Sequence, residues 1–200
     1  MLRIIEKQFR KPNGILGKIV SKIMQLGYSK AYDKIINSLE IKENDNLFEI
    51  GYGHGLGIEE ILSKYNCSIS GIDYSELMYH QALKRNKKQI KKGKLKLHFD
   101  NFLNHKLKQK HYNKIFCLNV IYFWEKLEIP FSKIKHGLKD NGLFCFYMDH
   151  PDELSKQGFM KEDLFNKYTI NEVIEKLKLS GFNEISYEQD KMGYYVKCTS

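Results

Sequence analysis

The chain has 200 residues, of which 42% are hydrophobic, so it can bury one substantial core but not two, and we expect a single domain over residues 1–200. The chain has 33 lysines and arginines and 24 aspartates and glutamates. Its net charge of +9 suggests nucleic acid or an anionic membrane as a partner. The four cysteines form no C-x-x-C pair, which argues against a metal centre and a disulfide framework and favours the cytoplasm. No stretch is apolar over the length of a membrane span, which argues against a transmembrane segment.

Helical spacing of apolar residues marks the start of the chain. It runs from Ile15 to Met24 and again from Tyr28 to Leu39, which predicts an N-terminal cap of two amphipathic helices over residues 1–43. Over residues 44–150, the predicted cofactor-binding core, short apolar runs alternate with amphipathic helical stretches. Strands are predicted at residues 47–50, 68–73, 95–99, 114–118 and 143–148, and helices over about 56–65, from Ser75 onward, and over about 127–138.

The last quarter of the chain has a different pattern. Residues 151–168 show no clear period, and this long connection is predicted to be a lid over a site. Thr169 and Glu172 form a T-x-x-E capping box that opens a helix, and Gly181 ends it. Residues 182–187 and 193–198 then predict two strands of a hairpin. Together these elements specify an α/β fold: a seven-stranded, mostly parallel sheet with one antiparallel strand and helices on both faces.

The stretch LFEIGYGHGLG, residues 47–57, indicates a buried strand that turns sharply into a helix beside a ligand. Its alternating glycines permit backbone conformations closed to other residues and let the main chain approach a ligand. The spacing fails the dinucleotide fingerprint G-x-G-x-x-G, because the third glycine position is Leu56 or Ile58. Glu49 inside the strand would repel a pyrophosphate, whereas it suits a cationic or amino-bearing ligand such as S-adenosylmethionine.

Polar side chains follow the other predicted strands where they end. In open parallel sheets, ligands bind outside these carboxyl ends. Asp73 ends the second strand, where a carboxylate can accept from both hydroxyls of a ribose. The third strand leads into Asp100, Asn101 and Phe102, which offer polar groups to the edge of a base and an aromatic ring to its face. The fourth leads into residues 119–124.

The segments EIGYGHG, GIDYS, DNF and NVIYFWE, in this order and spacing, resemble the class I S-adenosylmethionine-dependent methyltransferases, especially the small-molecule branch that includes quinone-biosynthesis enzymes. The resemblance covers residues 47–148 well. It implies a Rossmann-like fold, S-adenosyl-L-methionine as the cofactor and S-adenosyl-L-homocysteine as the product. A methyltransferase that acts on a small-molecule acceptor is therefore the function that we expect.

The resemblance also implies roles for individual residues. The glycine loop would approach the methionine part of the cofactor, and Asp73 would bind the ribose. Residues 100–102 would frame the adenine, and residues 119 and 120 would line the pocket near the transferred methyl. The predicted cofactor-binding residues are Glu49, Gly51, Gly53, Gly55, Asp73, Tyr74, Asp100, Asn101, Phe102, Asn119 and Val120.

Two residues are candidates for catalysis. His150 follows the fifth strand beside the expected reaction centre, where an imidazole could act as a general base, and Tyr122 is a candidate for the pocket wall. Many methyl transfers need little more than alignment of the nucleophile with the sulfonium, so an enzyme without a base also agrees with the motifs. Tyr52 and His54 stand where family members commonly have smaller residues, and they motivate the alternative of a non-catalytic scaffold protein.

Structural roles compete with these interpretations. Asp73 also fits an ordinary carboxylate at a helix entry, Asp100 fits a turn residue, and Glu49 fits a buried carboxylate bonded to loop amides. The aromatic residues at 122–124 fit a position partly in the core, with one of them facing the pocket. His54 fits a loop residue without a chemical role.

The lysines concentrate away from the expected site. Their densest run, residues 84–96, spans a helix end and a strand start, which places it at the sheet edge opposite the cofactor, while the carboxyl edge collects acidic residues. No N-P-P-[FY] tetrapeptide, a sign of methylation at a nucleobase amino group, follows the fourth strand. This distribution weighs against nucleic acid and favours a neutral or cationic small molecule. An RNA-modifying methyltransferase is the alternative that the basic surface leaves open.

Overall fold

A computed structural model describes residues 13–14, 30–156 and 165–200 of the chain. The first predicted N-terminal helix, Ile15 to Met24, lies outside the described residues, as does the middle of the predicted lid. The second predicted helix is described from residue 30, and it is helical over residues 30–38. Within the described residues, no helix has the length and apolar character that crossing a membrane requires.

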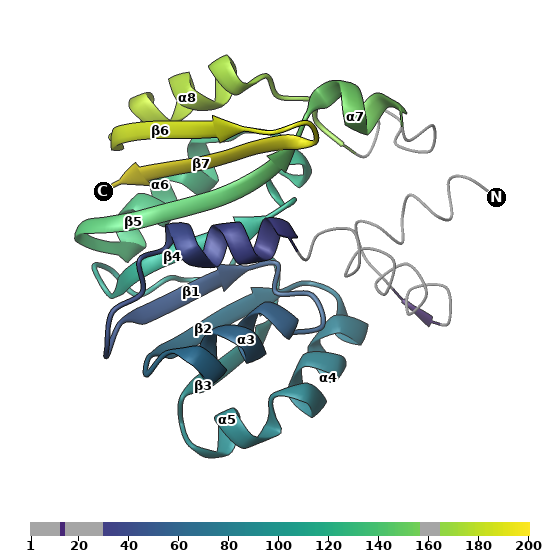
Figure 1. Cartoon of the computed structure of the whole chain (residues 1–200), viewed down its shortest axis with the longest axis vertical. Helices are drawn as coiled ribbons and strands as arrows, with labels where there is room; N and C mark the ends of the chain where they lie inside the picture. The colour runs from purple at the N-terminus through teal and green to yellow at the C-terminus, as the bar shows by residue number, and fades with distance from the viewer. Residues whose placement is uncertain (1–12, 15–29, 157–164) are drawn as a thin grey trace.

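One seven-stranded sheet runs through the molecule in the order β3-β2-β1-β4-β5-β7-β6 (Figure 1). Strands β1 to β5 pair in parallel, and β7 pairs antiparallel with both β5 and β6. The predicted fold class is therefore confirmed. The strands are β1 Asn46–Ile50, β2 Ser68–Asp73, β3 Leu95–Phe99, β4 Tyr112–Leu118, β5 Leu138–Asp149, β6 Asn183–Gln189 and β7 Gly193–Thr199.

Helices cover both faces of the sheet, which gives three layers (Figure 1). Helix 30–38, α3 and α4 pack on one face, and α6 and α8 pack on the other. Besides helix 30–38, the described residues form α3 Leu56–Lys64, α4 Glu76–Arg85, α5 Lys87–Lys91, α6 Glu128–Gly137, α7 Pro151–Lys156 and α8 Ile170–Leu179, with a 3-10 turn η1 at Ile121–Phe123.

Alternation along the strands sends neighbouring side chains to opposite faces of the sheet, so the core of this one domain is divided by the sheet into two clusters. In β1, Leu47 packs under helix 30–38 and α3, while Phe48 packs toward α6 and α8. All four cysteines are buried and unpaired in these cores, and burial raises the pKa of each thiol. Strand β1 and the second halves of β4 and β5 are buried on both faces, which explains why their sequences are continuous apolar runs.

Three elements differ from the sequence-based expectation. Strand β5 begins at Leu138 rather than residue 143, because Leu138 already pairs with Tyr112 of β4, and the register shifts before Leu143 pairs with Lys114. Helix α5 was not predicted, because its lysine-rich sequence carries no apolar period. Helix α7 occupies the start of the predicted lid. The predicted capping box of α8 is present, with Thr169 accepting from the Glu172 amide.

The strand order reverses between β1 and β4, so the connections that leave these two strands diverge. The loops after them meet at this point. A Cβ atom added to Gly51 would lie 2.6 Å from Val120 Cγ2, which shows how closely the two loops approach. The fold thus places the glycine loop at the switch point, where open α/β sheets bind ligands.

Replacing Gly71 of β2 with alanine should destabilise the fold by about 1–3 kcal/mol, because the added Cβ would lie 2.8 Å from the buried Tyr52 ring. Urea unfolding measures the loss, with Ser68→Ala on the same strand as the control. In a Tyr52→Leu background the same glycine change should cost clearly less. An equal cost in both backgrounds would contradict this packing explanation.

Candidate functional site

The glycine loop follows β1 and adopts a backbone that other residues rarely tolerate. Gly51, Gly53 and Gly55 have φ angles of 76°, 54° and 77°. A Cβ on Gly55 would lie 2.6 Å from Asn86 Nδ2, and that amide donates to the Gly55 carbonyl at 2.9 Å. Asn86, at the junction of α4 and α5, therefore fixes the far end of the loop. Asn86 is not identified from the sequence, because it lies inside the lysine-rich run of residues 84–96, which is predicted to lie away from the site.

Asp73 joins the glycine loop to the end of β2. Its Oδ2 accepts from the Gly53 amide at 2.9 Å and its Oδ1 accepts from the Ser75 amide at 2.8 Å. Burial raises the pKa of Asp73 to about 6, although the amides of Ser75, Gly53 and Tyr74 lower it. The carboxylate is only partly buried, so it can still face a ligand. Both predicted roles, helix entry and ligand contact, fit this placement.

Glu49 lies inside β1, two residues before the loop, and its side chain is fully buried. Tyr32 of helix 30–38 donates to Glu49 Oε1 at 2.6 Å. Among the described residues, Glu49 Oε2 has no hydrogen-bond partner. Burial raises the pKa of Glu49 to about 8, the Tyr32 bond lowers it, and nearby Asp73 raises it. Glu49 is thus not satisfied by loop amides, and its second oxygen remains available.

Tyr52 and His54, the bulky residues of the loop, differ in their burial. Tyr52 is buried in the core beneath Gly71, and its hydroxyl donates to the His98 carbonyl at 2.9 Å. His54 is partly buried, and burial together with Arg85 lowers its pKa. The tyrosine therefore stabilises the junction of the loop with β2 and β3 instead of filling the space above the loop.

The loop after β3 presents two polar residues and buries an aromatic one. Asp100 and Asn101 are exposed, and Asp100 Oδ1 accepts from the Asn101 amide at 2.7 Å. Phe102 is buried, with its ring centroid 5.8 Å from that of Trp124. His105, which the sequence did not single out, places Nδ1 3.5 Å from Asp100 Oδ2. The ring of Phe102 thus faces the core, and its predicted contact with adenine stays a prediction.

The loop after β4 lies against the glycine loop. Asn119 has a positive φ of 54°, and its amide donates to the Tyr147 carbonyl at 3.0 Å. Its side-chain Oδ1 accepts from the Tyr122 hydroxyl at 2.5 Å, and the same hydroxyl accepts from the Asp149 amide. Tyr122 is buried, and its hydroxyl links the ends of β4 and β5 through these two hydrogen bonds. Its predicted catalytic role stays a prediction.

His150 follows β5, and its ring lies against the β6–β7 hairpin. Its centroid is 4.4 Å from that of Tyr194, and its Nε2 is 2.8 Å from Gln189 Nε2. Its amide donates to the Met192 carbonyl. The hairpin lies beyond β5, on the side of the sheet away from β1, so these contacts do not connect His150 to the glycine loop. Its role as a general base stays a prediction.

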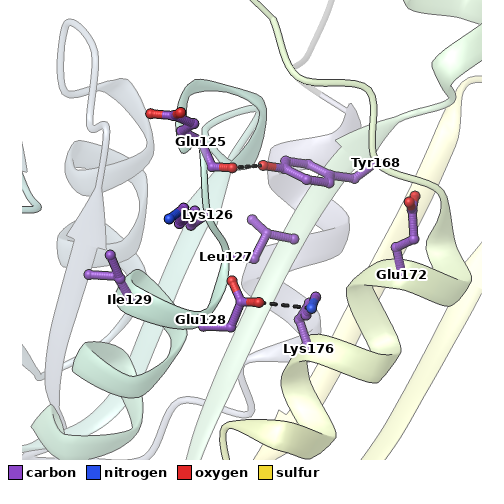
Figure 2. Close-up of a pocket in the computed structure, with 8 residues that line it drawn as sticks. All are labelled: Glu125, Lys126, Leu127, Glu128, Ile129, Tyr168, Glu172 and Lys176. Carbon is purple, nitrogen blue, oxygen red and sulfur yellow. Dashed lines mark hydrogen bonds and ion pairs between the residues drawn. The ribbon is translucent and has the colours of Figure 1, made fainter.

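A surface pocket of about 410 Å³ lies between the N-terminal ends of α6 and α8 (Figure 2). Glu128 and Lys176 form an ion pair across it at 2.8 Å, and the Tyr168 hydroxyl donates to the Glu125 carbonyl at 3.0 Å. None of the predicted site residues lines it. In the described part of the chain, no three His, Cys, Asp or Glu side chains gather in a way that could hold a metal ion.

Residues 48–144 match a family model described as a methyltransferase domain. A curated relative named "Putative methyltransferase YrhH", from Bacillus subtilis (strain 168), is 26% identical over 122 residues, which are 58% of this chain and 63% of that protein. The match thus spans less than two thirds of the relative. These matches support a methyltransferase.

Solved structures show the same architecture at low sequence identity. An S-adenosylmethionine-dependent methyltransferase from Mesorhizobium loti has a TM-score of 0.76 and 14% identity, over 88% of this chain and 100% of that one. Phosphoethanolamine N-methyltransferase 2 from Haemonchus contortus, in complex with phosphomonomethylethanolamine and S-adenosylhomocysteine, has a TM-score of 0.75 and 16% identity, over 94% of this chain and 46% of that one. The fold is that of the class I methyltransferases.

Glu49→Gln should change how stability depends on pH in the protein without ligand. Because the folded pKa of Glu49 is about 8, above the ordinary 4.5, its contribution to stability is complete below pH 4.5 and is lost as the pH rises toward 8. Between pH 5 and pH 8 the free energy of unfolding of the parent should therefore fall by about 3 kcal/mol relative to that of Glu49→Gln. Urea unfolding of both proteins at several pH values measures this change. If the difference in their free energies of unfolding does not vary with pH, the raised pKa of Glu49 is ruled out.

Tyr122→Phe should reduce stability by about 1–3 kcal/mol, because it removes both the bond to Asn119 Oδ1 and the acceptor of the buried Asp149 amide. Chemical denaturation measures the loss. Tyr187→Phe, at a side chain that is 46% exposed on β6, is the matched control and should have little effect. A Tyr122→Phe protein as stable as this control would show that the hydroxyl does not hold the two strand ends.

Proposed function

We propose that this protein is an S-adenosylmethionine-dependent methyltransferase that acts on a small-molecule acceptor. The observation that carries the proposal is the hydrogen bond from the Gly53 amide to Asp73, which joins the glycine loop to a carboxylate at the next strand end. The glycines let the backbone of the loop approach a ligand closely, and the carboxylate can accept hydrogen bonds from the hydroxyl groups of a ligand. The family match to residues 48–144 supports the methyltransferase part of this proposal.

The described residues fit this cofactor. Gly51 and Gly55 let the loop pack against Val120 and Asn86, where a Cβ would clash, and no atom lies within 4 Å of the position that a Cβ on Gly53 would take. Glu49 Oε2 is buried and has no hydrogen-bond partner in the described part of the chain, which suits the amino group or the sulfonium of the methionine part. Asp73 already accepts hydrogen bonds from the Gly53 and Ser75 amides among others, and its two oxygens have further lone pairs for the ribose hydroxyls. When bound, the cofactor supplies a methyl group activated by its sulfonium.

The protein contributes mainly alignment in the proposed mechanism. Asn119 and Val120 lie opposite the glycine loop, where they would wall the space around the transferred methyl. Tyr122 holds Asn119 in its positive-φ conformation through a hydrogen bond. With the His150 ring engaged by the hairpin, proximity and orientation account for the transfer without a base at the described positions.

Charge distribution supports a small acceptor in place of a nucleic acid. The lysines of α5 precede β3, so they lie at its amino end, opposite the edge that carries the glycine loop. A polyanion bound there would not present a base to the methyl group. We infer a neutral or cationic acceptor, with quinone-type aromatics among the compounds to test, and the buried, unpaired cysteines support a cytoplasmic location.

Asp73→Ala should weaken binding of S-adenosylhomocysteine by at least about tenfold, because it removes a hydrogen-bonding carboxylate worth about 1.5–3 kcal/mol. Isothermal titration measures this. Asp190→Ala is the matched control, since Asp190 also accepts two backbone amides, from Met192 and Gly193, but on the β6–β7 connection. If the unmodified protein does not bind the nucleoside at all, or if both variants bind equally well, the proposed cofactor site is wrong.

Methyl transfer itself is tested with labelled S-adenosylmethionine and separate panels of small aromatic alcohols, amines and RNA. Transfer to a small molecule supports the proposal. Transfer to RNA alone supports the RNA-modifying alternative, and binding of the cofactor without transfer to any panel supports a scaffold protein. The Asp73→Ala protein should lose transfer in whichever panel is active, because the same site binds the cofactor.

A further inference from the structure

Tyr32 contacts the site from outside the family match. It lies on helix 30–38, whereas the methyltransferase model covers residues 48–144. Its hydroxyl bonds Glu49 Oε1 at 2.6 Å, and its ring covers Gly57 so closely that a Cβ there would lie 2.2 Å from Tyr32 Cε1. One side chain thus contacts both the strand before the glycine loop and the helix after it.

The bond to Tyr32 determines which oxygen of Glu49 remains available. Burial and the nearby carboxylate raise the pKa of Tyr32, so the hydroxyl keeps its proton and acts as the donor. Glu49 Oε1 is therefore the acceptor, and Oε2 is the buried oxygen without a partner among the described residues. Since a buried polar atom is costly when unpaired, this oxygen indicates a donor or cation that the ligand brings.

We propose that Tyr32 is a positioning residue that holds Glu49 as a proton-releasing carboxyl of the cofactor site, so that binding of the cofactor expels the Glu49 proton into solvent. This inference rests on the proposed function, because it requires that the ligand bring a positive group to the loop. No bond other than the carboxyl O–H changes: the proton leaves Oε2, and the carboxylate pairs with the cationic group.

The groups around Glu49 agree with a neutral carboxyl in the empty site. Tyr32 faces it from helix 30–38, Asp73 from the end of β2, Cys117 from β4 and Tyr52 from the loop. None of these is a cation, so among the residues that the structure describes only the Tyr32 hydrogen bond favours the ionised form of Glu49. The pKa of about 8 means that the carboxyl is largely protonated at pH 7. A bound cation would lower this pKa, because opposite charges stabilise each other.

Titration of S-adenosylhomocysteine in buffers of different ionisation enthalpy counts the protons released. The unmodified protein should release up to about 0.9 proton per nucleoside at pH 7, and affinity should rise about tenfold from pH 6 to pH 7 and flatten above pH 8. In Glu49→Gln, which cannot release a proton at this position, both effects should be lost apart from the contribution of Asp73, whose pKa is about 6.

Tyr32→Phe separates positioning from simple packing. Without the hydroxyl, the Glu49 carboxylate loses its donor, so the rise in affinity should move to higher pH. Tyr65→Phe is the control, because Tyr65 packs on the same face and its hydroxyl has no hydrogen bond in the described structure, and its pH profile should match the parent. A structural role alone would lower affinity equally at every pH.

The outcomes separate this inference from the proposed function. If S-adenosylhomocysteine does not bind, the proposed function fails and this inference with it. If it binds with the same proton count in the parent and in Glu49→Gln, only the inference is wrong. If the pH profiles of Tyr32→Phe and the parent coincide, Glu49 does not depend on Tyr32 and the positioning role is overturned.

Discussion

The hydrogen bond from the Gly53 amide to Asp73 is the interaction on which the site depends. It closes the glycine loop against the neighbouring strand end, and the second oxygen of the same carboxylate fixes the Ser75 amide at the start of α4. The loop backbone, the β2 end and a helix start are thereby held by one side chain. Because these amides lie at an edge where parallel strands end, the sheet itself offers them no ladder partners.

Other buried polar contacts extend this arrangement around the carboxyl edge. Asn86, at the junction of α4 and α5, donates to the Gly55 carbonyl, and Tyr122 links Asn119 to the end of β5. Each of these side chains satisfies backbone or side-chain groups of loops that the helices and strands leave open. The apolar cores on the two faces set the sheet, whereas these polar contacts set the shape of its edge.

The parts of the site that could be predicted from the sequence are those encoded locally. Asp73 follows an apolar strand and precedes a helix-capping serine, so the spacing alone places it at a strand end. Tyr32 acts on Glu49 from a helix 17 residues earlier in the chain, and no spacing rule connects them. Phe102 was expected at the ligand, but its burial depends on Trp124, a contact that only tertiary structure defines. The inward course of Tyr52 depends likewise on space left by Gly71.

The buried cysteines have a consequence for how this protein can be studied. Cys67 packs at the start of β2, Cys117 lies in β4, Cys145 in β5 and Cys198 in β7, so they sample four strands of the sheet. A thiol reacts as the thiolate, and burial both shields these groups and disfavours ionisation. Alkylation of each cysteine therefore requires the sheet to open, which makes the four thiols built-in reporters of where the fold opens first.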